Sequence, residues 1–162
     1  MNDYKYYLDD GILDFQSGKY EDAIDKINQS LGLKDDWEIP YFYRAAANQA
    51  LENFDDAILD YTKALQYNPK MIDAYFNRAK ILLSRKDIKN PDLNRAMSDL
   101  EKAIELDPNF VDALYAMGAL HKKLENYHQA LVYLNKAIEL SPDFIYAKAL
   151  KKLILTKYVD KL

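Results

Sequence analysis

Apolar residues recur along most of the chain at intervals of three and four, the spacing that places side chains on one face of an α-helix. Ile58, Tyr61 and Leu65 show this spacing within one segment. With 4 glycines and 5 prolines among 162 residues, few positions interrupt such helices. The pattern predicts an all-α protein built from amphipathic helices joined by short turns.

The pattern also repeats at long range. The phrases YEDA, FDDA, LNRA and YHQA recur at steps of 34, 39 and 34 residues, and they carry the alanines Ala23, Ala57, Ala96 and Ala130. Twelve positions earlier, allowing for a five-residue insertion in the third repeat, stand Gly11, Ala45, Ala79 and Gly118. Small residues at both points let two helices cross closely. The period therefore predicts an array of antiparallel helix pairs.

A proline closes three of the repeats, at Pro69, Pro108 and Pro142. Proline cannot continue a helix but fits the first turn of the next one. The residues just before these prolines suit an N-cap role, and they are Asn68, Asp107 and Ser141.

The small residues, the aromatics and the closing proline resemble the tetratricopeptide repeat (TPR) family, most clearly in YTKALQYNP, LEKAIELDP and LNKAIELSP. The resemblance implies a right-handed α-solenoid of about nine helices. It implies one domain over residues 1–162, with repeats at approximately 4–37, 38–71, 72–110 and 111–144. The lysine-rich segment 145–161 is expected to form a capping helix, with a polar face covering the end of the array.

Two repeats depart from this pattern. Repeat 1 has Asp35 in place of the closing proline, so we expect an irregular link at 34–38 that Trp37 covers. Repeat 3 carries its insertion around Asp87 to Pro91, where Asn90 and Pro91 predict an early helix start. The role of the insertion stays open.

In the family, defined positions of the first helix of each repeat line a concave groove that binds ligand. We expect the groove of this chain to take an apolar or amphipathic peptide, with its lysines meeting an acidic part of that peptide. The alternative is that the aromatics pack between adjacent helices. The selected groove residues are Leu8, Ile12, Phe42, Tyr43, Phe76, Asn77, Lys80, Tyr115 and Lys122.

Some family members bind the acidic tails of heat-shock chaperones through a carboxylate clamp of lysine, arginine and asparagine. In one register the clamp positions hold Leu8, Ile12, Tyr43 and Asp73, and in the next register they hold Phe42, Asn77, Ala46, Asp112 and Ala116. Of these residues, Asn77 alone has a side chain of the type that the clamp uses. The resemblance therefore disfavours a clamp-type co-chaperone.

Candidate chemistry is sparse. The sequence has no cysteine, no glycine-rich phosphate loop and no nucleophile or zinc-protease motif. His121 and His128 are expected to be solvated turn histidines, because a metal site would need further ligands. We expect no catalytic site, no metal and no cofactor, and predict a protein-interaction adaptor or scaffold.

Net charge and hydropathy limit which kinds of partner the chain is expected to bind. Net charge is −4, which disfavours a nucleic-acid partner, and no apolar run approaches the length of a membrane span. The N-terminal residues do not resemble a signal peptide, so we expect a cytoplasmic protein. Residues 1–60 carry 14 acidic and 5 basic side chains, whereas residues 121–162 carry 4 and 8. The family resemblance leaves a dedicated small chaperone for a secreted or assembling protein as one alternative to the adaptor. The charge asymmetry leaves another, a scaffold that self-associates head to tail.

Overall fold

The computed structural model describes residues 3–84 and 90–159, and it separates into two compact units, residues 1–81 and 82–162. Within the described ranges the chain forms nine α-helices and no strand, so the all-α prediction is confirmed. None of the described helices is both long and apolar enough to cross a bilayer. Each unit is described separately below.

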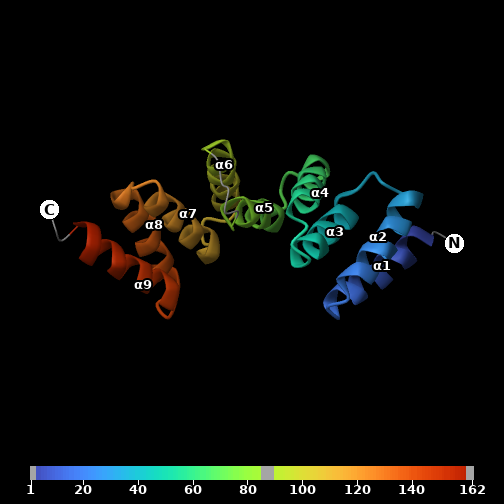
Figure 1. Ribbon diagram of the computed structural model, residues 1–162, viewed down its shortest axis with the longest axis horizontal. Helices are drawn as coiled ribbons and strands as arrows, with labels where there is room; N and C mark the ends of the chain where they lie inside the picture. The colour runs from blue at the N-terminus through green and yellow to red at the C-terminus, as the bar shows by residue number, and fades with distance from the viewer. Residues whose placement is uncertain (1–2, 85–89, 160–162) are drawn as a thin grey trace. The chain divides into compact units, whose positions relative to one another are not determined.

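Unit 1 is built from antiparallel helix pairs (Figure 1). Helix α1 pairs with α2, α3 pairs with α4, and α2 also contacts α3. Most of α5 belongs to the same unit. The bounds are α1 Asp3–Gln16, α2 Tyr20–Leu33, α3 Glu38–Ala50, α4 Phe54–Tyr67 and α5 Ile72–Ser84.

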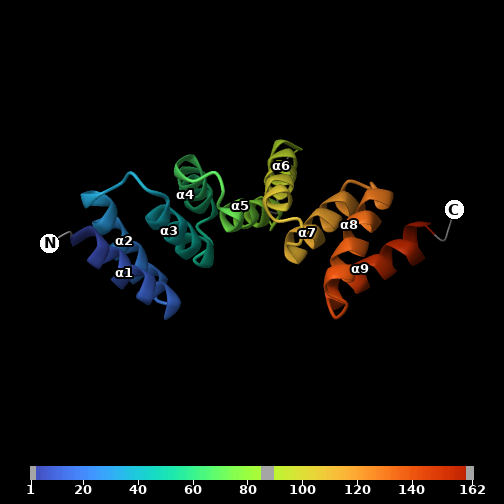
Figure 2. The ribbon, with the colours of Figure 1, turned by 180° about the vertical axis from the view of Figure 1, so that it is seen from behind.

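Unit 2 continues the same arrangement. Helix α6 contacts α7, α7 pairs with α8, and α9 lies along α8 (Figure 2). A short π-helical turn, η1, follows α9 directly. The bounds are α6 Asn90–Leu106, α7 Val111–Lys123, α8 Tyr127–Leu140, α9 Ile145–Ile154 and η1 Leu155–Val159.

The repeated small residues lie where helices approach most closely. Ala45 and Ala79 have no exposed surface, nor do the four alanines of the repeated phrases. At Gly11 and Gly118 the approach is closer still, because an added Cβ would lie 2.9 Å from Ile27 Cγ1 or 2.8 Å from Leu134 Cγ. The predicted close helix crossings are confirmed.

The turns between repeats differ from the prediction. Helices α5, α7 and α9 each begin four residues after Asn68, Asp107 and Ser141, so these residues are not N-caps. Asn68 instead ends α4, and its side chain accepts the backbone N–H of Lys70 at 3.1 Å. Asp107 accepts the N–H of Asn109 at 2.9 Å in the same way. The proline after each residue opens a turn before the next helix starts.

The two departures from the repeat pattern in the sequence also appear in the structure. Residues 34–37 form a non-helical link, which confirms the expected irregularity. Trp37 was expected to cover this link, and its ring packs edge-on against Tyr4 of α1 at 5.8 Å. Helix α6 begins at Asn90, which confirms the early start in repeat 3. Residues 87–89 of the insertion lie outside the described residues.

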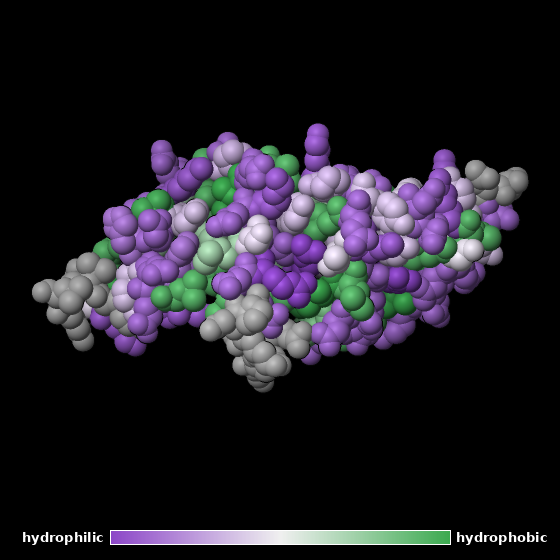
Figure 3. Space-filling view, turned by 90° about the horizontal axis from the view of Figure 1, so that it is seen from above, coloured by the Kyte–Doolittle hydropathy of each residue, from purple (hydrophilic) through white to green (hydrophobic). Residues whose placement is uncertain are grey.

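Helix α9 completes the core of unit 2. Ala147 and Ile154 are fully buried in one cluster with Leu114, Leu134 and Ala137. Its exposed side carries lysines, as expected for a capping helix. Figure 3, a view from above, shows hydrophobic residues in separate green patches between hydrophilic side chains.

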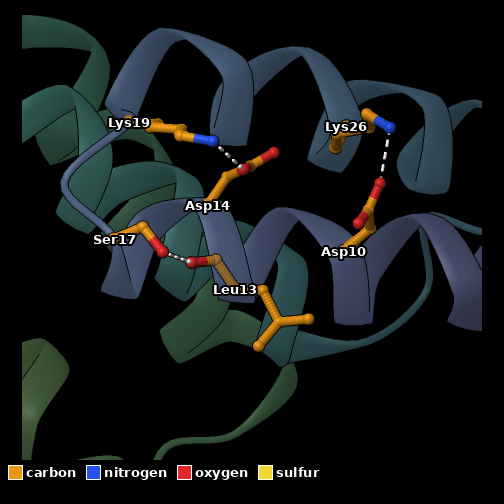
Figure 4. Close-up of polar contacts among 6 residues, drawn as sticks. All are labelled: Asp10, Leu13, Asp14, Ser17, Lys19 and Lys26. Carbon is orange, nitrogen blue, oxygen red and sulfur yellow. Dashed lines mark hydrogen bonds and ion pairs between the residues drawn. The ribbon is translucent and has the colours of Figure 1, made fainter.

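Equivalent ion pairs join the two helices of repeats 1 and 2. Lys26 of α2 pairs with Asp10 of α1 (Figure 4). At the positions 34 residues later, Arg44 of α3 donates two hydrogen bonds of 2.7 Å to Asp60 of α4. Arg44 also donates to the Asn28 side chain at 2.6 Å, which links α3 to α2. The two repeats thus place opposite charges at equivalent positions, with the polarity exchanged.

Candidate functional site

The predicted groove residues of repeats 1 and 2 lie on α1 and α3, within unit 1. Ile12, Phe42 and Tyr43 are half-buried, whereas Leu8 is 3% exposed. Leu8 therefore belongs to the core, and its side chain offers no surface to a ligand. The remaining three side chains form the exposed part of this face.

The aromatic rings of this face pack on one another between helices. Phe15 of α1 contacts Tyr43 of α3 with ring centroids 5.7 Å apart. Tyr43 contacts Phe42 at 5.6 Å, and Phe42 contacts Tyr61 of α4 at 5.8 Å. The Phe15–Tyr43 contact thus joins repeats 1 and 2, and the other two contacts lie within repeat 2.

The hydroxyl group of one of these rings, Tyr61, makes polar contacts that connect three helices. Tyr61 is fully buried, and its hydroxyl donates to Gln49 Oε1 at 2.9 Å. Asn77 of α5 is hydrogen-bonded to the same tyrosine side chain. Burial raises the pKa of Tyr61 far above its usual value, so the phenol stays a neutral donor. Asn77 is therefore tied to the core of unit 1.

On α5, Phe76 is half-buried and Lys80 is exposed. The Lys80 ammonium lies 5.4 Å from the centre of the Phe76 ring, within the range of a cation–π contact. This pair combines an aromatic surface and a positive charge at one end of unit 1.

The other predicted residues, Tyr115 and Lys122, lie on α7 in unit 2 and are half-buried. The Tyr115 ring contacts Phe144 at 5.2 Å, and Phe144 contacts Tyr146 at 6.1 Å. These contacts run from α7 to the start of α9. The predicted residues therefore fall into two groups, one in each unit.

Two residues of this second group were missed by the sequence analysis. Tyr146 is 69% exposed and Leu153 is 42% exposed, both on α9. They stand 34 residues after Asp112 and Ala119, which occupy groove positions of repeat 4. Extending the position count into the capping helix would have found them. We call Tyr115, Phe144, Tyr146 and Leu153 the α7/α9 face.

One of the two histidines differs from the expectation. His121 lies in the last turn of α7 and stacks on Tyr133 of α8, with centroids 5.4 Å apart and planes 9° from parallel. Its buried Nδ1 has no hydrogen-bond partner among the described residues. Burial lowers the pKa of His121, which favours the neutral ring. His128 is exposed at the start of α8, as expected.

Acidic and histidine side chains do not gather into a metal site in the described part of the chain. No group of three or more potential ligands is placed to hold an ion there. Each unit by itself carries partly exposed aromatic side chains and lysines, Phe76 with Lys80 in unit 1 and Tyr115 with Lys122 in unit 2.

Comparison with known families agrees with the repeat analysis. Family models described as tetratricopeptide repeat or TPR repeat match residues 39–71, 91–125 and 111–144. Together with the helix pairs described above, these matches define a class of protein built from repeated helical hairpins. The chain belongs to the tetratricopeptide repeat family, whose members mediate protein–protein interactions.

The chain aligns with part of the length of several curated relatives. Hsp70-Hsp90 organizing protein 1 of Glycine max is 31% identical over 120 residues, which are 68% of this chain and 20% of that protein. Mitochondrial import receptor subunit TOM70 of Homo sapiens is 38% identical over 71 residues, 41% of this chain and 12% of that protein. The chain thus spans a fifth or less of the length of these relatives.

Solved structures show the same fold. MamA from Desulfovibrio magneticus RS-1, residues 41 to the end, superposes with a TM-score of 0.85 at 20% identity, covering 99% of this chain and 89% of that one. The first TPR of Spaghetti (RPAP3), bound to the HSP90 peptide SRMEEVD, gives a TM-score of 0.69 at 24% identity, covering 75% and 93%.

Proposed function

We propose that this chain is a non-catalytic interaction module that binds an apolar or amphipathic peptide segment on its first-helix faces. The observation that carries the proposal is the α7/α9 face. Tyr146 exposes its ring beside Phe144, which packs on Tyr115. Leu153 exposes its side chain seven residues further along α9, on the same side of that helix. Exposed apolar clusters of this kind mark interaction sites, and tyrosine is a common interface anchor.

The neighbouring charges extend the proposal. Lys122 and Lys123 occupy the last turn of α7, on the helix that carries Tyr115. A peptide with an apolar core and a flanking acidic residue would match this combination. In unit 1 the Phe76–Lys80 pair offers the same combination on a smaller scale.

A chaperone-tail clamp is the less favoured ligand mode, although one relative is an Hsp70-Hsp90 organizing protein and one neighbour holds an HSP90 peptide. The clamp needs cationic or amide side chains that reach the ligand carboxylates. Here Leu8 is buried and Asn77 is bonded to Tyr61, while Asp73 carries the opposite charge. These three positions favour an apolar ligand over an acidic tail.

The test uses a peptide library displayed on phage, selected against the whole chain. Selected peptides are then synthesised, and their affinities for the chain and for the variant Tyr146→Glu, Leu153→Glu are measured by fluorescence anisotropy. Both side chains are exposed, so the variant should keep its helical circular-dichroism spectrum. We expect selected peptides rich in aromatic and aliphatic residues, with affinity reduced at least about tenfold in the variant.

A matched control introduces the same charges on the second-helix side of unit 2. Val132 and Leu140 of α8 are 49% and 40% exposed, so Val132→Glu, Leu140→Glu replaces two exposed apolar side chains that are not part of the α7/α9 face as defined. This control should bind like the wild type. If both variants bind equally well, or if the library yields acidic tails that bind independently of Tyr146 and Leu153, the proposal is wrong.

A further inference from the structure

Helix α9 occupies the position of a first helix in a fifth repeat, but its partner-facing side is altered. Ala147 is buried without exposed surface, like Ala113 at the same position of α7. In α7 the side facing α8 carries Leu114, Gly118 and His121. The residues 34 positions later are Lys148, Lys152 and Leu155. Two lysines thus lie where a second helix would normally pack.

A hollow of about 430 Å³ lies at this side of α9. It is lined by Ile138, Lys148, Lys151, Lys152, Leu155 and Thr156. The lining is mostly apolar, since lysine stems add to Ile138 and Leu155, yet three of its six residues are lysines. No ion pair joins these three lysines to any residue in the described ranges. An occupant should therefore carry both apolar and acidic side chains.

The size of Lys152 also limits how close an occupant can come. At Gly118, the equivalent position, an added Cβ would already lie 2.8 Å from Leu134. A helix packed as tightly as α8 would collide with the Lys152 side chain. An occupant must sit further out, at a distance where its own carboxylates meet the lysine ammonium groups.

The outward face of α1 has the complementary character. Tyr6 and Leu13 are 65% and 61% exposed, and their spacing of seven residues puts them on one side of the helix. Figure 4 shows the Leu13 side chain directed away from α2, whereas Asp10 and Asp14 point toward it. Asp3 and Asp9 are exposed on the same helix and make no ion pair with any described residue.

From these two surfaces we infer that the chain associates head to tail: the Tyr6–Leu13 face of α1 in one copy docks in the lysine-lined hollow of α9 in a second copy. Apolar contact between Tyr6, Leu13 and Leu155 would be flanked by ion pairs from Asp3 and Asp9 to the lysines. Because different surfaces meet, a pair of copies leaves one α1 face and one hollow free, and the association can extend. The inference uses surfaces other than the α7/α9 face, so it stands or falls independently of the proposed function.

Charge exchange tests the inference directly. The variant Lys151→Glu, Lys152→Glu alters the hollow, and Asp3→Lys, Asp9→Lys alters the α1 face. All four residues are at least partly exposed, so both variants should fold, which circular dichroism checks. Sedimentation velocity at low ionic strength should show concentration-dependent oligomers for the wild type. Each variant alone should raise the dissociation constant at least about a hundredfold, because like charges then meet.

Mixing the two variants is the decisive step. The Glu-bearing hollow of one variant is complementary to the Lys-bearing α1 face of the other, and the two unaltered surfaces also match. An equimolar mixture should therefore form oligomers in which the two variants alternate. The control variant Lys70→Glu, Lys136→Glu has the same charge change at exposed positions outside the hollow and should associate like the wild type. High salt should weaken the association. A wild type that stays monomeric at every concentration, or a mixture that stays monomeric, would overturn the inference.

Discussion

The backbone of Gly118 in α7 lies directly against the side chain of Leu134 in α8. A Cβ at Gly118 would stand 2.8 Å from Leu134 Cγ and 3.3 Å from the backbone oxygen of Ala130. Repeats 2 and 3 have alanine at this position. The packing of α7 on α8 leaves no room for a methyl group at Gly118.

Gly118→Ala should destabilise the protein by about 1–3 kcal/mol, because the added methyl group forces the two helices or the Leu134 rotamer to move. Gly32→Ala is the matched control. Gly32 lies within α2 with open space around its Cα, so alanine there should stabilise by about 0.5–1 kcal/mol through helix propensity. Urea unfolding followed by circular dichroism measures both, and shifts of the same sign would contradict the packing argument.

The turns inside repeats 2 and 4 place glutamate where repeat 1 has glycine. Glu52 and Glu125 have a φ of 62°, and Gly18 has a φ of 76°. This left-handed conformation costs a residue with a side chain roughly 1–2 kcal/mol. We expect Glu52→Gly to raise the free energy of unfolding by up to about 1 kcal/mol. Glu101→Gly, inside α6, should lower it by a similar amount. Thermal unfolding of the two variants compares them, and a loss in both would rule out the turn explanation.

The Arg44–Asp60 pair predicts a charge-exchange result. Arg44→Asp or Asp60→Lys alone should cost on the order of 3 kcal/mol, because each leaves like charges in a partly buried contact. The double variant should recover much of this loss, since it reproduces the polarity of Asp10 and Lys26 in repeat 1. A double-mutant cycle from urea unfolding gives the coupling. Additive losses in the double variant would show that Arg44 acts chiefly through other contacts, such as Asn28.

His121 predicts a pH dependence of stability. Its folded-state pKa is lowered by burial, so the unfolded chain binds a proton at higher pH than the folded chain does. The full stability is present above the unfolded pKa of about 6.5 and decreases as the pH falls below it toward the lowered folded pKa. His121→Phe keeps the stacking on Tyr133 and removes the titration. The difference in unfolding midpoint between variant and wild type should grow in favour of phenylalanine from about pH 8 to pH 5. A constant difference would contradict this.

The fold was predictable because its determinants are local and repeated. The alanines and glycines at helix crossings recur at fixed steps, so one repeat predicts the next. The predicted starts of α5, α7 and α9 were wrong because the closing proline was placed in the first turn of the next helix. In the structure the Asn68 and Asp107 side chains stabilise a separate turn there. Backbone position in such a turn depends on contacts that the periodicity does not contain.

The candidate site was less predictable, because a position on a helix face does not fix burial. Leu8 and Ile12 were both predicted to face the groove, yet Leu8 lies in the core and Ile12 is half-buried. Asn77 was selected as a ligand contact, but it bonds to Tyr61, a residue sixteen positions away. Tyr146 and Leu153 were missed because the capping helix was not counted as a repeat. Whether the groove residues bind a peptide stays a prediction.

The exchanged polarity of the Asp10–Lys26 and Arg44–Asp60 pairs bears on how similar hairpins find their own partners. Four helices of like length and pattern could pair wrongly while the chain folds. If α1 paired with α4, Asp10 would face Asp60, and if α3 paired with α2 in the hairpin register, Arg44 would face Lys26. Both mismatches bring like charges together, whereas each native hairpin brings opposite charges together. Two side chains per hairpin thus favour the native pairing of these four helices over the two mispairings.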